Sequence, residues 1–123
     1  MKLFRSRTVP IGAAVLGLVM IGGGVMKLAS QPGVAAQFAG FGLPAWFRAL
    51  VGTFEVLGGL LLMMPSTTPI GSLVLSTIMV GAVWAHAANG QWPEILPSAV
   101  LLIVFLAIFR RNRSRAIHLL GGA

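Results

Sequence analysis

The chain lacks cysteine entirely and has few charged residues for its length. Among its 123 residues, charged residues make up 9%, and only two are acidic. Without cysteine, the chain cannot form disulfides, thiol redox centres, iron–sulfur clusters or cysteine-ligated metal sites. A soluble domain carries about 25% charged residues, so the scarcity of charge excludes an ordinary soluble protein. If this protein takes part in redox chemistry, the electrons must travel on a bound cofactor or on a partner.

What is present is mostly apolar sequence. Hydrophobic residues make up 57% of the chain, and its mean hydropathy is +0.93. The length suits one domain, so residues 1–123 are expected to form a single membrane domain. The first apolar stretch, residues 8–26, contains no charge. It resembles a signal peptide, but it is long enough to cross a bilayer, which needs about 20 apolar residues. We therefore expect it to be retained as the first helix.

The pattern of apolar stretches predicts an all-α, polytopic membrane four-helix bundle. Polar turns rich in proline, glycine and asparagine separate the stretches. The fourth is expected to be the shortest, because the continuous apolar run over 95–109 gives a helix of only about 22 Å. The membrane spans are expected at about residues 9–28, 46–65, 69–89 and 94–110.

Residues 29–45, between the first and second spans, predict a different kind of element. Pro32-Gly33 and Gly42-Leu43-Pro44 break the chain at either end. Between them lies a short, weakly amphipathic piece around Phe38, too short to span a membrane. We expect it to lie in the interface, or to re-enter the bundle and fold over it as a lid.

The distribution of positive charge predicts the orientation. Four spans put both termini on one side, and positive charge marks the cytoplasmic side. Both termini are therefore expected in the cytoplasm, with residues 110–123 as a basic tail, most simply at a bacterial inner (plasma) membrane. Trp46 and Trp92 are then expected at the outer interface. Basic ends also suit contact with anionic lipid, whereas nucleic-acid binding is not expected, since no aromatic residues interleave the arginines. The terminal basic residues are Lys2, Arg5, Arg7, Arg110, Arg111, Arg113 and Arg115.

Three ionisable residues, Lys27, Glu55 and His86, lie within or at the edge of the apolar stretches. A charge in hydrocarbon costs about 2.5–3.5 kcal/mol even on a lenient scale, so such residues usually face a bundle interior. Glu55 lies nine residues after Trp46, or about 13 Å into the membrane. Because side chains lean toward their own helix N-terminus, all three tilt toward one layer in the outer half. They are the candidate catalytic residues.

Each of these residues also has a purely structural interpretation. Lys27 could reach toward the interface, His86 could be a hydrogen-bonded packing residue, and Glu55 could pair with Lys27 only to hold the helices together. The charge of Glu55 stays open, because burial favours its neutral form and a nearby lysine its charged form. A metal site is not expected, since one interior histidine and one glutamate fall short of the usual ligands. Candidate ligand-binding residues around the layer are Phe38, Arg48, Gly52 and Asn89.

The order and spacing of several short motifs resemble the DoxX-like family of small four-helix membrane proteins. The similarity covers roughly residues 12–105. It implies a four-helix membrane bundle with Lys27, Glu55 and His86 as its polar positions. The motifs are Gly24-Val-Met-Lys27-Leu, Phe38, Gly42-Leu-Pro44, Gly52-x-x-Glu55-x-x-Gly58, Pro65, Met79-x-Gly81-Ala82-x-x-x-His86 and Pro97.

The resemblance also suggests a function. The family takes its name from membrane subunits of a quinone-linked thiosulfate oxidoreductase. By this similarity the chain is expected to be a subunit of a membrane oxidoreductase that binds a quinone-like or other hydrophobic ligand in an outer-leaflet polar pocket. His86 and Lys27 would hydrogen-bond a carbonyl oxygen of the ligand, while Glu55 would accept or release a proton. The absence of cysteine argues against thiol-based sulfur chemistry by this chain alone.

Two other functions fit the same residues. The chain could be a non-catalytic accessory subunit of a larger membrane complex, since glycine-lined helices suit packing against other helices. It could also be a small proton-coupled transporter acting as a homodimer, with Glu55 as the carrier carboxylate. Besides the lipid bilayer, the expected partners are other membrane-protein subunits or further copies of the chain. The sequence leaves open whether the protein is an enzyme, what it binds and its oligomeric state.

Overall fold

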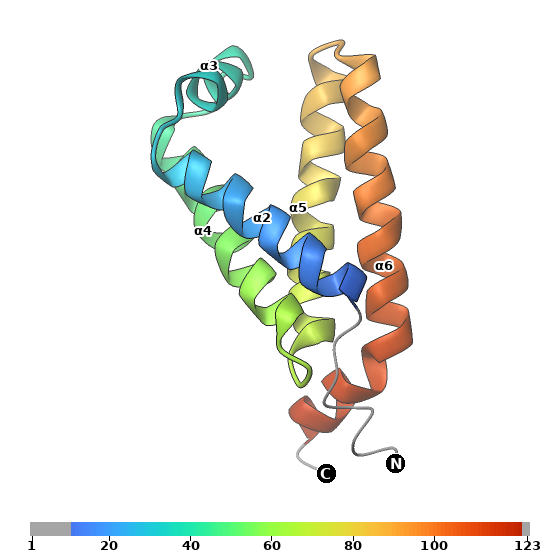
Figure 1. The fold of residues 1–123 in the computed structure, drawn as a ribbon. Helices are drawn as coiled ribbons and strands as arrows, with labels where there is room; N and C mark the ends of the chain where they lie inside the picture. Colours follow the sequence, from blue (N-terminus) through green and yellow to red (C-terminus); the bar gives the residue numbers. More distant parts are fainter. Residues whose placement is uncertain (1–10, 122–123) are drawn as a thin grey trace.

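The computed structural model describes the backbone of residues 11–121 and the side chains of residues 11–114. The N-terminal basic residues Lys2, Arg5 and Arg7 therefore lie outside the described part of the chain. The described residues form helices and no strand (Figure 1). The helices are α2 (Ile11–Leu28), α3 (Pro32–Gly40), α4 (Ala45–Met63), α5 (Thr68–Ala88) and α6 (Trp92–Gly121).

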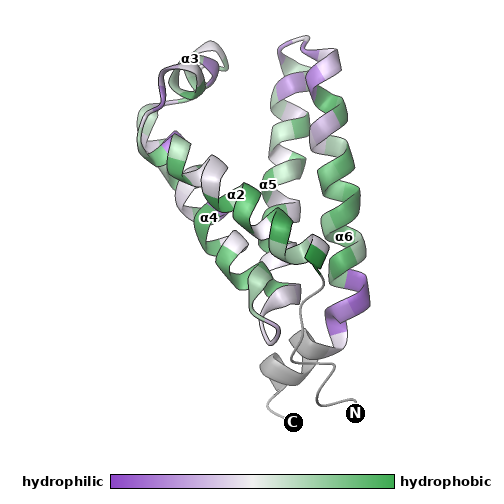
Figure 2. Cartoon of the chain, viewed as in Figure 1, coloured by the Kyte–Doolittle hydropathy of each residue, from purple (hydrophilic) through white to green (hydrophobic). Residues whose placement is uncertain are grey.

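Four of these helices, all but α3, are long and apolar enough to cross a membrane. Within the residues whose side chains are described, these helices are 18, 19, 21 and 23 residues long. Apolar residues predominate along these helices, while hydrophilic residues gather in the turn between α5 and α6 and beyond the apolar part of α6 (Figure 2). The predicted all-α membrane architecture is confirmed, and the short segment expected between the first two spans contains helix α3.

The fourth spanning helix is longer than the sequence predicted. Helix α6 begins at Trp92 and continues to Gly121. The part that is long and apolar enough to span a membrane lies within Trp92–Ser114, and Arg110, Arg111 and Arg113 follow its apolar run. The helix extends beyond both ends of the expected span, residues 94–110, and the bounds of the span itself stay a prediction. Pro93 and Glu94 fit the first helical turn, where proline needs no hydrogen-bond partner for its missing N–H. The arginines after Phe109 are good helix formers, so the basic segment extends the helix through Gly121.

The spanning helices form two antiparallel pairs. Helix α2 packs along α4, and α5 packs along α6, while α4 and α5 join the pairs. The pairs lie close together near the turn between α4 and α5, and they diverge toward the opposite end, which carries α3 (Figure 1). We call this the α3 end. The buried core joins all four spanning helices through Ala13, Met20, Leu62, Leu75, Met79 and Phe105.

Glycines on facing surfaces hold α2 against α4. A Cβ atom built on Gly24 would lie 2.6 Å from the carbonyl oxygen of Gly52, and one built on Gly52 would lie 2.8 Å from that of Gly24. Gly17 and Gly59 face each other in the same way, at 2.9 and 2.7 Å. Each helix therefore contributes two glycines seven residues apart, on one face. Small residues let membrane helices approach backbone to backbone, so this pair of helices is close along its length.

The junction between the two pairs is tight only at its turn end. A Cβ on Gly71 of α5 would lie 2.7 Å from the carbonyl oxygen of Gly58 on α4. Beside it, the hydroxyl of Thr68 donates to the carbonyl oxygens of Leu62 and Met64, at 3.0 and 2.9 Å. Nearer the α3 end no glycine contact joins α4 to α5 among the described residues. The two pairs therefore separate in this direction.

Helix α3 reaches from the α2–α4 pair toward α5. The side chain of Gln31 accepts a hydrogen bond from the Val34 N–H at 2.9 Å and so caps its first turn. Phe38 is buried and lies edge-on to Phe41, with ring centroids 6.3 Å apart. Phe41 in turn meets the edge of His86 on α5, at 5.5 Å. The segment thus spans the gap between the pairs at the α3 end.

Candidate functional site

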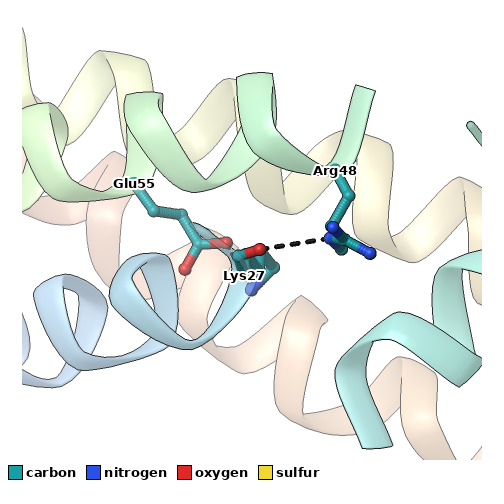
Figure 3. Close-up of polar contacts among 3 residues, drawn as sticks. All are labelled: Lys27, Arg48 and Glu55. Atoms are coloured by element: carbon teal, nitrogen blue, oxygen red, sulfur yellow. Dashed lines mark hydrogen bonds and ion pairs between the residues drawn. The ribbon is translucent and has the colours of Figure 1, made fainter. Parts of the chain in front are cut away.

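An ion pair between α2 and α4 lies at the centre of the candidate site. The Nζ atom of Lys27 is 2.6 Å from Oε1 of Glu55, and the two side chains are 19% and 5% exposed. Figure 3 shows Glu55 on α4 facing Lys27 on α2. The pair forms because Gly24 and Gly52 bring the two helices together one turn away. Each charge therefore has its partner within the protein.

Gly23 leaves space for the carboxylate of Glu55. A Cβ atom on Gly23 would lie 3.0 Å from Oε2 of Glu55 and 3.9 Å from Nζ of Lys27. With Oε1 bound to Lys27, the second oxygen lies over a bare stretch of helix backbone. Gly23, Lys27 and Glu55 all line the same cavity.

This cavity has a volume of about 750 Å³ and lies between the two helix pairs. Residues from all five described helices and from the segment after α3 line it. Most of the lining is apolar or glycine, which favours a hydrophobic ligand. The polar residues of the lining are Lys27, Gln37, Glu55, Thr77, His86 and Ser98.

Several lining residues also face the outside of the helices. Val19, Leu50, Phe54 and Trp84 line the cavity and yet are 57%, 43%, 45% and 69% exposed. They belong to three helices that span the membrane by length and composition. A side chain that both lines a cavity and is exposed lies at its opening. The cavity is therefore open toward the flank of the bundle that lipid would cover.

His86 joins the site from α5. Its Nδ1 atom lies 2.8 Å from Oε1 of Gln91, and its own carbonyl oxygen accepts from the Gln91 N–H at 2.8 Å. The residue is 9% exposed, and its ring lies edge-to-face with the ring of Phe41. Gln91 and Phe41 thus hold the imidazole in one orientation at the cavity wall. The structure brings Lys27, Glu55 and His86 to one cavity, although of these three residues only Lys27 and Glu55 form a polar contact with each other.

Arg48 fastens the start of α4 to the end of α2. Its Nε donates to the carbonyl oxygen of Lys27 at 3.1 Å (Figure 3) and its Nη2 to the hydroxyl of Ser30 at 2.6 Å. A cation at a helix C-terminus satisfies free carbonyl groups and complements the helix dipole. Arg48 is not among the residues that line the cavity. Its contacts orient the helix that carries Lys27.

The other three candidate ligand-binding residues differ in their placement. Phe38 lines the cavity. Gly52 lies behind the cavity, against the backbone of Gly24. Asn89 donates from Nδ2 to the carbonyl oxygen of Ala85 at 2.8 Å, and it lies outside the lining. Of these three, the structure brings only Phe38 to the cavity surface.

Sequence reasoning missed Gln37, Thr77 and Ser98 as polar lining residues. Ser98 had a usable signal, since it is the only hydroxyl between residues 92 and 109. Gln37 and Thr77 had no such signal. A polar residue is ordinary in a short helix between two spans, and a threonine is ordinary in a span that contains several hydroxyl residues. Within the described residues, no group of three histidine, aspartate or glutamate side chains gathers to hold a metal ion.

The comparison with known families agrees with this geometry. The model of the DoxX-like family matches residues 11–108. The chain belongs to the DoxX-like family. The match includes the cavity-lining ionisable residues Lys27, Glu55 and His86, and the predicted resemblance is confirmed. As a DoxX-like protein with four spanning helices, it is an integral membrane protein. Comparison with curated proteins and with solved structures finds no match.

Replacing Arg48 with methionine is expected to destabilise the protein by about 1.5–3 kcal/mol, the usual size for hydrogen bonds made by a charged group. The loss arises because the carbonyl oxygen of Lys27 and the hydroxyl of Ser30 lose their donor. Unfolding in mixed micelles of a mild detergent and SDS measures it. Arg110→Met is the control, because Arg110 is exposed and should change stability by less than about 0.5 kcal/mol. Equal losses of stability in both variants would contradict a stabilising role for the two hydrogen bonds of Arg48.

Proposed function

We propose that this DoxX-like protein is a subunit of a membrane oxidoreductase and binds a quinone-like hydrophobic ligand in its cavity. The observation that carries the proposal is the cavity itself. It measures about 750 Å³, its lining is mainly apolar, and the ion pair of Lys27 and Glu55 lies in its wall. Ligand sites of about 300–1,000 Å³ with apolar walls and a few placed polar groups are typical of small-molecule binding.

The opening of the cavity supports a ligand that comes from the bilayer. Exposed residues such as Phe54 and Trp84 line it on the flank of the bundle. A lipid-soluble molecule could therefore enter sideways without leaving the membrane. At the α3 end, Phe38 and Phe41 cover the cavity instead. This arrangement favours a hydrophobic molecule over a water-soluble one.

The polar lining suits an oxygen-bearing ring. Lys27 has N–H groups beyond the one that faces Glu55, and these can donate to a carbonyl oxygen. Glu55 lies within the same wall and is the group that would accept or release a proton when the ring changes its oxidation state. Catalytic roles for Lys27, Glu55 and His86 are part of this proposal.

The orientation of the protein belongs to the proposal as well. The exposed arginines at positions 110, 111 and 113 follow the apolar part of α6. By the positive-inside rule this end faces the cytoplasm. The α3 end, with the cavity, would then face the opposite side of a bacterial inner membrane, in its outer leaflet.

Mass spectrometry of the organic extract of the purified protein tests the proposal. We expect a quinone or a similar lipid to copurify at close to one molecule per chain. A Gly81→Phe variant should lose it, because Gly81 lines the cavity and has no atom within 4 Å of its Cβ position. Gly22→Phe is the matched control. Gly22 also has free space around it but lies outside the lining, so this variant should keep the ligand.

The outcomes separate the functions. A wild-type extract without any such molecule, together with no binding of added short-chain quinones, would contradict the proposal. Stoichiometric copurification of other membrane proteins with an empty cavity would favour the accessory-subunit alternative. Equal ligand content in both glycine variants would show that the bound molecule lies elsewhere on the protein.

A further inference from the structure

The hydrogen bond between His86 and Gln91 determines which nitrogen of the imidazole carries a proton. Nδ1 of His86 lies 2.8 Å from Oε1 of Gln91. An amide carbonyl oxygen can only accept a hydrogen bond, so Nδ1 must be the donor. In the neutral ring the other nitrogen, Nε2, then carries a lone pair and acts as an acceptor. The partner of one ring nitrogen thus sets the chemistry of the other.

Nε2 of His86 has no partner in the described part of the chain. The hydrogen bond of the His86 side chain with a described residue is made by Nδ1 and not by Nε2. Every side-chain nitrogen or oxygen that is fully buried among the described residues has a partner. Nε2 therefore keeps some accessible surface. Since the residue is only 9% exposed and lines the cavity, this surface faces the cavity. An acceptor in an apolar cavity calls for a ligand that donates.

Ser98 on α6 supplies a second unpartnered group in the same wall. Among the buried hydroxyls of the described spans, Thr68, Ser72 and Ser76 each donate to a backbone carbonyl oxygen. Ser98, 9% exposed, makes no hydrogen bond with any residue that the structure describes. Buried polar groups are almost always paired. An unpaired serine and an unpaired imidazole nitrogen on neighbouring helices therefore mark a place where the polar part of a ligand binds.

Aromatic side chains around these groups favour a ring. The chain has seven phenylalanines and three tryptophans, and half of these ten residues line the cavity. Aromatic rings pack edge to face or offset, which favours another ring between them. These residues are Phe38, Phe41, Phe47, Phe54 and Trp84.

We propose that the cavity selects ligands whose aromatic ring carries a hydroxyl group, with His86 Nε2 accepting the hydroxyl hydrogen. This inference rests on the proposed binding of a quinone-like molecule, and it assigns the reduced quinol form to the site. Ser98 on the same wall completes the contact as donor or acceptor. The ion pair of Lys27 and Glu55 on the opposite helix pair meets the far side of the ring. Gln91 acts as a positioning residue, since it holds the proton on Nδ1.

A matched pair of probes tests the hydroxyl without any redox chemistry. 4-Pentylphenol and 4-pentylanisole have the same ring and chain, but only the phenol can donate. Their binding to the full-length protein in lipid nanodiscs is followed by tryptophan fluorescence, because Trp84 lines the cavity. The phenol should bind about tenfold more tightly than the anisole, the size of one well-made hydrogen bond to a buried group.

In His86→Phe, the ratio of the dissociation constants of the anisole and the phenol should fall close to one, mainly because the phenol binds more weakly. Comparing the ratio of the two dissociation constants between proteins cancels the unequal partitioning of the probes into lipid. Ser98→Ala should lower the preference by a smaller factor. Asn89→Ala is the control and should keep the wild-type ratio, since Asn89 lies one turn from His86 but outside the lining.

Each outcome has a distinct meaning. Equal binding of both probes to the wild-type protein would overturn the selectivity and leave the hydrophobic cavity as proposed. Binding of neither probe would overturn both. A preference that persists in His86→Phe would overturn the role of this nitrogen. Because the first comparison uses only the wild-type protein, it stands even if a variant does not fold.

Discussion

A Lys27→Met variant is expected to lose about 3 kcal/mol of stability, because it leaves the carboxylate of Glu55 buried without its partner. The two groups are 2.6 Å apart, and the side chain of Glu55 is only 5% exposed. The pair lies between helices that an apolar environment surrounds. No other basic side chain contacts Glu55 among the described residues. In this variant, α2 and α4 should also pack less closely against each other.

The reverse change should have a smaller effect. In Glu55→Met, Lys27 loses its partner but lies in the last turn of α2 and is 19% exposed. A lysine near a helix end can extend its chain to the interface and keep its charge in water. We expect a loss of about 1 kcal/mol, the usual range for a hydrogen-bonded interaction. The Lys27→Met/Glu55→Met double variant should recover most of the loss of Lys27→Met, since apolar residues often replace a buried ion pair without penalty.

Unfolding of the three variants in mixed detergent micelles gives a complete double-mutant cycle. The same proteins also separate structure from function. If the pair only holds the helices together, the double variant should keep its copurified ligand. If the pair contacts the ligand, the double variant should fold but lose it. A Lys27→Met variant no less stable than Glu55→Met would contradict the buried-carboxylate argument.

Gly24→Val is expected to prevent normal packing of α2 on α4, with a loss of about 3 kcal/mol or more, the upper part of the range for overpacking. A Cβ at this position would lie 2.6 Å from the carbonyl oxygen of Gly52 and 3.0 Å from the amide nitrogen of Val56. Both atoms are backbone, which no side-chain rotation moves. The helices must separate, and Lys27, three residues later, would move away from Glu55.

Gly22→Val is the matched control for this change. Gly22 lies two residues earlier on the same helix, and nothing lies within 4 Å of its Cβ position. Valine there should change stability by less than about 0.5 kcal/mol, as for surface substitutions without special contacts. Unfolding midpoints distinguish the variants. A crosslink or another distance measurement between α2 and α4 shows whether the two helices have separated. Similar losses for Gly22→Val and Gly24→Val would contradict the glycine contact.

The sequence predicted the four spanning helices and pointed to the ionisable residues within them, because both depend on local composition. A run of apolar residues appears in the sequence whatever its neighbours are, and so does a charge within it. The fourth helix was predicted too short, because helix continuation after Phe109 does not depend on hydrophobicity. Arginines form helix readily outside the membrane, and α6 runs on to Gly121.

The roles of the polar residues depended on contacts between helices. Nothing local shows that Arg48 reaches the carbonyl oxygen of Lys27, or that Gln91 binds the ring of His86. Both bonds follow from how the helix ends meet. Ser98 is the only hydroxyl residue between residues 92 and 109, but only the structure shows that it has no hydrogen-bond partner among the described residues.

By itself, the sequence determined that this chain crosses a membrane four times, and that the ionisable residues Lys27, Glu55 and His86 lie in its apolar helices. Hydropathy and spacing are properties of single segments, so they can be read without the fold. Only the tertiary structure decided that two tight helix pairs diverge toward the α3 end and enclose a cavity of about 750 Å³. That result depends on which glycines face each other, and the facing of two helices is a property of neither one alone.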